Sequence, residues 1–212
     1  MTKGEHTRDA LVATTGELLR RQGYHATGLA QIVAESGAPR GSIYFHFPGG
    51  KDELATRALD AAGAAWRARI DAVIAAAPDL GAAVRAVCEL LADDLAASDY
   101  QDGCPVAAVA LENPSPVVRD AIAAHYERWL AAIAARAGGA QLGRGIATFV
   151  LASIEGALLL AKATRSKQPL HTVGAMLAAL SSSAPGSSRP AGPRRTRRSA
   201  GRRTGRRTGP RR

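Results

Sequence analysis

The sequence predicts an all-α protein. Alanine dominates a composition that is 46% hydrophobic and only 4% aromatic, and alanine favours helix over strand. No stretch alternates apolar and polar residues as a half-buried strand does, whereas apolar residues three to four positions apart recur along the first 181 residues. The 212 residues are enough for one large or two small domains, each with a hydrophobic core.

Two helices are predicted at the start of the chain. A first helix is predicted over about residues 5–22, after a loose start, because its leucines fall on one helical face. Gly23 is expected to end it. A second helix is predicted after Thr27, whose hydroxyl suits the N-cap position. It is expected to end at Gly37, because glycine adopts the left-handed conformation that a tight turn needs.

Residues 38–51 (APRGSIYFHFPGGK) predict a short third helix followed by a break. Pro39 fits the first turn of this helix, where its missing N–H costs nothing. Ile43 and Phe47 lie one turn apart and are expected to point inward, which leaves a cation, a hydroxyl and a phenol outside. A two-turn helix with such an exposed face is typical of a reader of the DNA major groove.

Six further helices are predicted beyond this break. The first of them, residues 51–77, has early apolar residues that suit the N-terminal part and later ones that suit a second core. A helix shared in this way can carry movement from one part to the other. The remaining five are expected at residues 79–97, 104–112, 116–137, 141–165 and 169–180.

Residues 8–54 resemble the DNA-binding domain of the TetR family of bacterial repressors. The family pattern is a first helix ending in Gly-Tyr or Gly-Phe, a Thr cap, a turn, and a helix of the form small-x-Gly-[Ser/Thr]-[Leu/Ile]-Tyr-x-His-Phe. This chain supplies Gly23-Tyr24, Thr27, Ser36-Gly37 and the run from Gly41 to Phe47. The turn at residues 48–51 is one residue longer than usual, and with residues 103–112 it resembles the LmrA/YxaF-type branch.

The resemblance implies a nine-helix fold in two domains. Residues 5–50 would form the helix-turn-helix DNA-binding domain, with three helices. Residues 51–181 would form a helical domain that binds an effector and makes a homodimer. Residues 182–212 follow as a tail.

Candidate DNA contacts gather on the third helix. Arg40 either reads a base, where a bidentate guanidinium on guanine gives roughly 1–3 kcal/mol of discrimination, or binds a phosphate. Gly41 allows close approach to the groove, and Ser42 can serve a phosphate or a base edge. Phe45 either touches a thymine methyl or packs. The resemblance implies further contacts to the DNA backbone from Thr27, Tyr44, His46 and Lys51.

The resemblance also implies a small, often hydrophobic or aromatic effector, bound between the middle helices. The candidate lining residues share a bulky, aromatic, sulfur-bearing or acidic side chain on those helices. For each of them, ordinary core packing is the alternative. They are Trp66, Cys104, Tyr126, Trp129, Phe149 and Glu155.

The net charge of +10 belongs to the tail. Residues 189–212 carry eleven arginines and no acidic residue, which leaves 17 Lys and Arg against 18 Asp and Glu in the rest of the chain. Residues 182–212 have almost no apolar side chain, so we expect them to be disordered. An arginine-rich tail binds polyanions with a steep salt dependence, either as an aid to DNA affinity or without a selected role.

Several other classes of protein are disfavoured. The chain has no Gly-rich phosphate loop, HExxH or GxSxG motif, and its five histidines lack ligand-like spacing, so we expect no enzyme, cofactor or metal site. Two cysteines do not make a disulfide framework, and the polar N-terminus is not a signal peptide. The apolar run 146–163 contains Glu155 and Lys162 and is expected to be a dimer-interface helix of a cytoplasmic protein, with no membrane partner.

Together these features predict a homodimeric DNA-binding repressor. Its two copies would pack through the last two long helices and bind a palindromic operator on double-stranded DNA. A small hydrophobic effector would release it. The alternatives are a ligand-binding helical dimer with only non-specific, tail-driven DNA association, and a helical small-molecule binder or enzyme that has lost its DNA function.

Overall fold

The computed structural model describes residues 2–112, 114–137 and 140–182, and this part of the chain forms nine helices and no strand. The predicted all-α class is therefore confirmed. The predicted tail from residue 183 onward lies outside the described residues. The helices are α1 Lys3–Ala26, α2 Leu29–Ser36, α3 Ser42–His46, α4 Gly50–Ala76, α5 Leu80–Ala97, α6 Pro105–Ala110, α7 Pro116–Arg136, α8 Ala140–Thr164 and α9 Gln168–Ser182.

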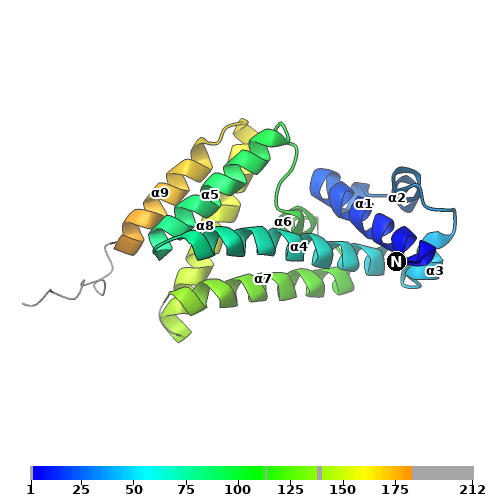
Figure 1. Ribbon diagram of the computed structural model, residues 1–212, viewed down its shortest axis with the longest axis horizontal. Coiled ribbons are helices and arrows are strands. Elements are labelled where there is room, and N and C mark those ends of the chain that lie inside the picture. Colours follow the sequence, from blue (N-terminus) through cyan, green and yellow to red (C-terminus); the bar gives the residue numbers. More distant parts are fainter. Residues whose placement is uncertain (1, 113, 138–139, 183–212) are drawn as a thin grey trace, which may run out of the picture.

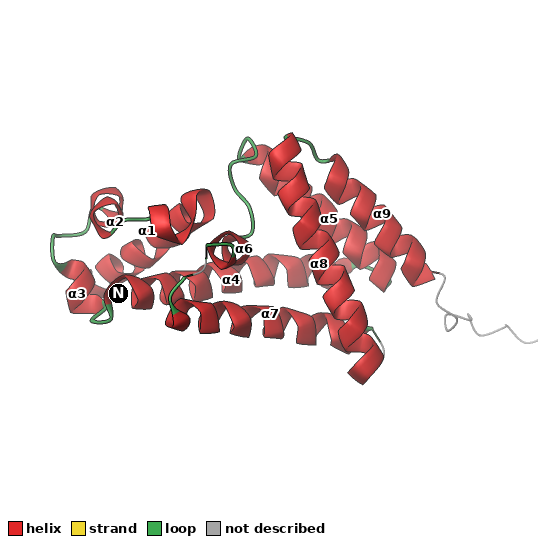
Figure 2. Ribbon diagram, turned by 180° about the vertical axis from the view of Figure 1, so that it is seen from behind, coloured by secondary structure: helices red, strands yellow, loops and turns green. Residues whose placement is uncertain are grey.

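The helices form a small N-terminal head and a larger helical body. Helices α1, α2 and α3 lie together at one end of the molecule, and α4 runs from this head along the length of the body (Figure 1). Helix α7 lies beside α4, while α5, α8 and α9 pack together at the far end (Figure 2). The short α6 packs against both α1 and α4, so it touches the head and the body at once.

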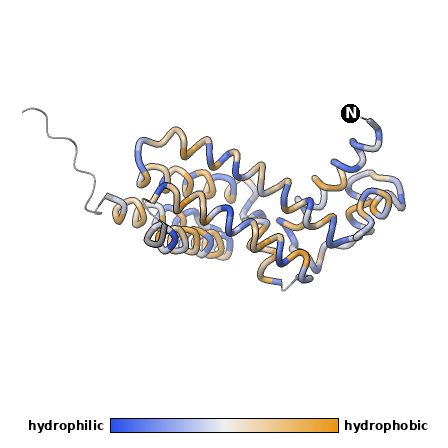
Figure 3. The backbone as a smooth tube through the Cα atoms, turned by 90° about the horizontal axis from the view of Figure 1, so that it is seen from below, coloured by the Kyte–Doolittle hydropathy of each residue, from blue (hydrophilic) through white to orange (hydrophobic). Residues whose placement is uncertain are grey.

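Two hydrophobic cores meet along α4. The head core consists of Leu11, Leu18, Ile32, Ile43, Phe47 and Leu54. The next residues of α4, Ala55, Ala58 and Leu59, belong to the body core instead. Hydrophobic residues recur along the body helices at the end away from the N-terminus (Figure 3). The predicted sharing of this long helix by two cores is observed, and within one turn it changes from one core to the other.

Helix α1 begins earlier and ends differently than predicted. Residues 1–4 were expected to be loose, but Thr2 and Glu5 form a reciprocal capping box that starts the helix at Lys3. Gly23 interrupts the helix with a φ of 77°, a conformation that favours glycine. Its Cα also faces Glu112, because a Cβ added at this position would overlap with the carboxylate of that residue.

Two predicted helix starts are wrong. Thr27 is not the N-cap of α2, because its backbone closes α1 and its buried hydroxyl donates to the carbonyl of Gly23 at 2.6 Å. Gly28 takes the N-cap position without a side-chain cap. Pro39 is not in α3, since its carbonyl accepts from Ser42 N–H in the preceding turn. The φ of 89° at Gly41 prevents the helix from extending back to this proline.

Helices α8 and α9 leave apolar side chains uncovered. The segment Gly143–Thr164 is long and apolar enough to cross a membrane by length and composition, and 28% of its most apolar window is buried. Phe149, Gly156 and Leu160 are spaced by seven and four residues, so they share one exposed face of α8. Met176 and Leu180 form a similar exposed pair on α9.

Candidate nucleic-acid interface and ligand pocket

Helix α3 is held by two buried side chains and presents the others to solvent. Ile43 and Phe47 are both buried in the head core, as the spacing predicts. Between them, the side chains of Tyr44 and Phe45 are 63% and 80% exposed. Aromatic rings that are exposed in this way are not stabilised by burial in the core. The geometry therefore offers Tyr44 and Phe45 to a partner surface.

The turn before α3 is fixed by glycine. Gly37 and Gly41 have φ values of 67° and 89°, which L-residues with a side chain rarely adopt. A Cβ at either position would meet nothing within 4 Å, so the requirement comes from the backbone conformation. The same open space leaves room in front of Gly41. Arg40 is exposed directly beside it, at the start of α3.

Lys51 is placed by an aromatic ring at the start of α4. Its Nζ atom lies 4.2 Å from the centroid of Tyr24, and burial lowers the pKa of Lys51. The Tyr24 hydroxyl donates to Oδ1 of Asp52, and burial followed by this carboxylate raises the pKa of Tyr24 to about 12. Hydrogen bonds from Ser115 and Tyr24 lower the pKa of Asp52. The ammonium thus has a defined place over the Tyr24 ring, near the carboxylates of Asp52 and Glu112.

The structure brings seven of the eight predicted DNA-contact residues to the surface of the head. The exception is Thr27, whose side chain is 1% exposed and whose hydroxyl is used inside the head. The hydroxyl that was predicted to contact a phosphate therefore lies inside the head, where it donates to the Gly23 carbonyl. The exposed or partly exposed residues are Arg40, Gly41, Ser42, Tyr44, Phe45, His46 and Lys51.

A contact that the sequence analysis missed joins the head to α6. Glu112 follows α6, and its Oε2 atom accepts the His25 N–H at 2.7 Å. The Glu112 carbonyl lies 2.8 Å from His25 Nε2. The two residues are 87 positions apart, so no local pattern could have shown the pair. It anchors the end of α1 to the body.

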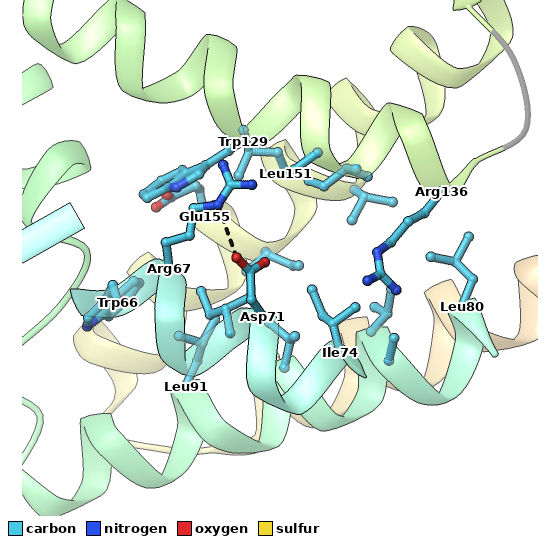
Figure 4. A pocket seen from close by; sticks show the side chains of 18 of the residues that line it. Trp66, Arg67, Asp71, Ile74, Leu80, Leu91, Trp129, Arg136, Leu151 and Glu155 are labelled. Carbon is cyan, nitrogen blue, oxygen red and sulfur yellow. Dashed lines mark hydrogen bonds and ion pairs between the residues drawn. The ribbon is translucent and has the colours of Figure 1, made fainter. Parts of the chain in front are cut away.

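A largely apolar cavity of about 130 Å³ lies in the body, between α4, α5, α7 and α8. Trp66 lies at one end of it, while Arg136 and Leu80 lie at the other (Figure 4). The charged residues Arg67 and Asp71 also line it and pair with each other at 3.2 Å. A cavity with this lining suits a small hydrophobic molecule.

Three of the six predicted effector residues line this cavity. They are Trp66, Trp129 and Glu155. Cys104 and Tyr126 are packed in or against the body core behind the lining, where they contact Glu155 and Trp129, respectively. Phe149 is 55% exposed on α8, because it faces outward beside the pocket-lining Val150. The sequence pattern does not indicate the charged lining residues Arg67, Asp71 and Arg136, because a charged residue on an exposed helical face and one that lines a pocket have the same spacing.

Glu155 is the titratable group that the cavity perturbs most clearly. Burial raises its pKa, and a hydrogen bond with Cys104 opposes this effect. Burial and then the nearby Glu155 charge raise the pKa of Cys104 and also that of Tyr126. The Cys104 thiol is therefore protonated at neutral pH and is a poor nucleophile.

Replacing Glu155 by glutamine is expected to stabilise the protein, and more strongly as the pH rises. The folded state holds the Glu155 proton more tightly than the unfolded state, so wild-type stability falls as the pH rises above the unfolded pKa of about 4.3. Glutamine does not titrate. Urea unfolding of Glu155→Gln and wild type at pH 4 and pH 7 measures the difference. The exposed Glu17→Gln is the control, and a difference that shrinks with pH would contradict the assignment.

Both halves of the chain match known protein families. Residues 11–58 match the family of bacterial regulatory proteins called the tetR family. Residues 81–176 match the C-terminal domain of LmrA/YxaF-like transcriptional regulators. The HTH-type transcriptional regulator LmrA of Bacillus subtilis is 33% identical over 170 residues, which cover 77% of this chain and 90% of LmrA. The uncharacterized regulator YxaF of the same organism is 32% identical over 190 residues, covering 85% and 97%.

Solved structures show the same fold. SCO4454, a TetR-family transcriptional regulator from Streptomyces coelicolor, superposes with a TM-score of 0.67 at 27% identity, covering 84% of this chain and 97% of that one. A TetR transcriptional regulator from Chloroflexus aurantiacus gives a TM-score of 0.72 at 25% identity, covering 86% and 98%. These proteins are transcriptional regulators. The chain therefore belongs to the TetR family of DNA-binding transcriptional regulators, in its LmrA/YxaF-like branch.

Proposed function

We propose that the protein is a homodimeric cytoplasmic repressor that leaves a palindromic operator when a small hydrophobic effector binds. The observation that carries this proposal is the α3 surface. Exposed Tyr44 and Phe45 stand on α3, which Ile43 and Phe47 fix in the head core, and exposed Arg40 lies two residues before this helix. A dimer would place two such helices about 34–36 Å apart, one DNA turn.

The DNA contacts divide into base readers and backbone contacts. Arg40 lies immediately before α3 and reaches a guanine, with Phe45 against a thymine methyl. Ser42, Tyr44, His46 and Lys51 hold the phosphates, which fix the register of the helix in the groove. Gly41 permits the close approach. At α2, the uncapped N-terminal N–H groups behind Gly28 replace the Thr27 hydroxyl as a phosphate site.

The dimer forms through α8 and α9. Their uncovered apolar residues include Phe149, Leu159, Leu160, Met176 and Leu180, each more than half exposed in one chain. A second copy covers them, since apolar patches of this kind mark protein interfaces. The exposed Gly156 allows the partner helix to come close.

The effector acts through α4. This helix lines the cavity with Trp66 and Ile70 and also contributes Leu54 to the head core. A ligand that favours a different position of α4 changes the spacing of the two heads, so only one half-site can be engaged. The coupling free energy is typically about 1–3 kcal/mol.

Selection from random duplex DNA near physiological salt tests this function. The full chain and a version ending at residue 182 are expected to enrich the same dyad-symmetric site. Arg40→Ala is expected to cost about 1–3 kcal/mol and to relax one position in each half-site, whereas the exposed Arg119→Ala on α7 changes neither. Loss of all enrichment in the shortened chain would instead favour non-specific association driven by the arginine-rich tail.

Leu160→Glu is expected to convert the dimer to a monomer, because it places a charge in the centre of the α8 face. Light scattering coupled to size exclusion measures the mass. Leu111→Glu is the matched control, since Leu111 is also an exposed leucine, 76% exposed against 56% for Leu160, but lies next to α6. A dimer that survives Leu160→Glu and dissociates with Leu111→Glu would place the interface elsewhere.

A further inference from the structure

A second cavity adjoins the apolar one across Trp66. It has a volume of about 260 Å³ and is lined by residues of α1, α4, α5 and α8 and of the loop before α6. Trp66, Leu91 and Leu158 line both cavities, so these three side chains form the shared wall. Trp66 is only partly buried and packs against the edge of the body core. Because Leu91 and Leu158 are buried, the indole is the part of this wall that a ligand spanning both spaces would displace.

The second cavity is polar where the first is apolar. Its charged lining residues are Arg20, Arg69, Asp94 and Asp102. Arg69 and Asp94 form a closed bidentate pair, with two N···O distances of 2.7 Å. Arg20 is held less completely, because Nη2 lies 3.2 Å from Asp102 while its Nε is buried without a hydrogen-bond partner. A buried donor without an acceptor costs free energy.

The volumes indicate that the two cavities serve one ligand. Sites for small molecules usually measure about 300–1,000 Å³. Neither the 130 Å³ cavity nor the 260 Å³ cavity reaches that size alone, whereas the joined space does. The charged side chains that line the apolar cavity are two arginines and two acids, of which Arg67 pairs with Asp71, while Arg136 lies at the end away from Trp66. An anionic end on the Trp66 side of the joined space would lie beside Arg20.

We propose that the effector is an elongated amphipathic acid whose apolar chain fills the first cavity and whose terminal carboxylate binds Arg20 in the second. This rests on the proposed function in one respect, namely that a ligand regulates the protein. The carboxylate competes with Asp102 for the Arg20 guanidinium, which Asp102 holds through a contact of 3.2 Å at Nη2.

A ligand bound to Arg20 would contact the head directly, through α1. Arg20 belongs to α1, whereas Asp102 lies in the loop between α5 and α6. Their ion pair is one of the links between head and body. A ligand carboxylate that takes over Arg20 breaks this link from inside the cavity. The effector would then free the head from this contact with the body directly, in addition to any effect that it has through α4.

Tryptophan fluorescence of the full-length protein tests the site. The chain has two tryptophans, Trp66 and Trp129, and both line the apolar cavity. Dodecanoate, dodecan-1-ol and dodecyltrimethylammonium serve as probes below their micelle-forming concentrations. Dodecanoate is expected to bind about tenfold or more tightly than dodecan-1-ol, because a hydrogen bond to a charged group contributes about 1.5–3 kcal/mol. Dodecyltrimethylammonium is expected to bind most weakly.

Two variants with opposite effects separate the proposal from misfolding. Arg20→Gln is expected to weaken dodecanoate about tenfold and to leave dodecan-1-ol unchanged. Asp102→Asn is expected to strengthen dodecanoate, because Arg20 loses its competing carboxylate; a damaged fold would not bind more tightly. Arg119→Gln, exposed on α7, is the control and should change nothing.

Three results would overturn the proposal: equal affinity for the acid and the alcohol, a preference for the cation, or dodecanoate binding that Arg20→Gln leaves intact. The fluorescence readout contains no DNA, so it is independent of the operator. Arg20-dependent dodecanoate binding by a protein that selects no DNA site would refute the repressor function and leave this site standing. A protein that selects an operator but does not bind dodecanoate would refute this ligand site and leave the repressor function standing.

Discussion

The first two turns of α4 are the constraint on which the rest of the structure depends. Leu54 completes the head core, and Ala55 begins the contribution of the same helix to the body core. Small side chains here bring α1 close, since a Cβ on Gly16 would lie 3.7 Å from the Ala58 carbonyl. Because adjacent residues are fixed in different cores, the head cannot turn on the body without disturbing one of them.

Hydrogen bonds also link the head to α7 and to the residues after α6. Asp52 links Tyr24 of α1 to Ser115, the N-cap of α7, and Glu112 binds His25 at the end of α1. Each contact joins the head to an element of the body that contains the apolar cavity, or to one beside it. Such contacts are made or lost as units, whereas packed cores deform little. The head therefore has a small number of discrete links through which a ligand in the body can change its position.

Helical periodicity predicted which side chains are buried and where the chain turns, but it did not predict contacts between residues far apart in the sequence. The burial of Ile43 and Phe47 and the left-handed Gly37 follow from spacing and residue type. The capping role of Thr27 failed because a cap depends on backbone direction, and here the hydroxyl turns inward to Gly23. The pairing of Arg20 with Asp102 joins residues far apart in the chain, which no spacing reveals. The head surface was thus largely predictable, and the cavity only in part.

The most direct test of the central claim is the distance between the two heads of the dimer. A spin label at the exposed Asp9→Cys on α1 reports it by pulsed electron paramagnetic resonance, because Cys88 and Cys104 are buried. Filling the apolar cavity with Ala83→Phe should imitate a ligand. One narrow distance is expected on the operator, and a shifted distance with weaker operator binding is expected in the filled variant. Weaker binding at an unchanged distance would contradict it.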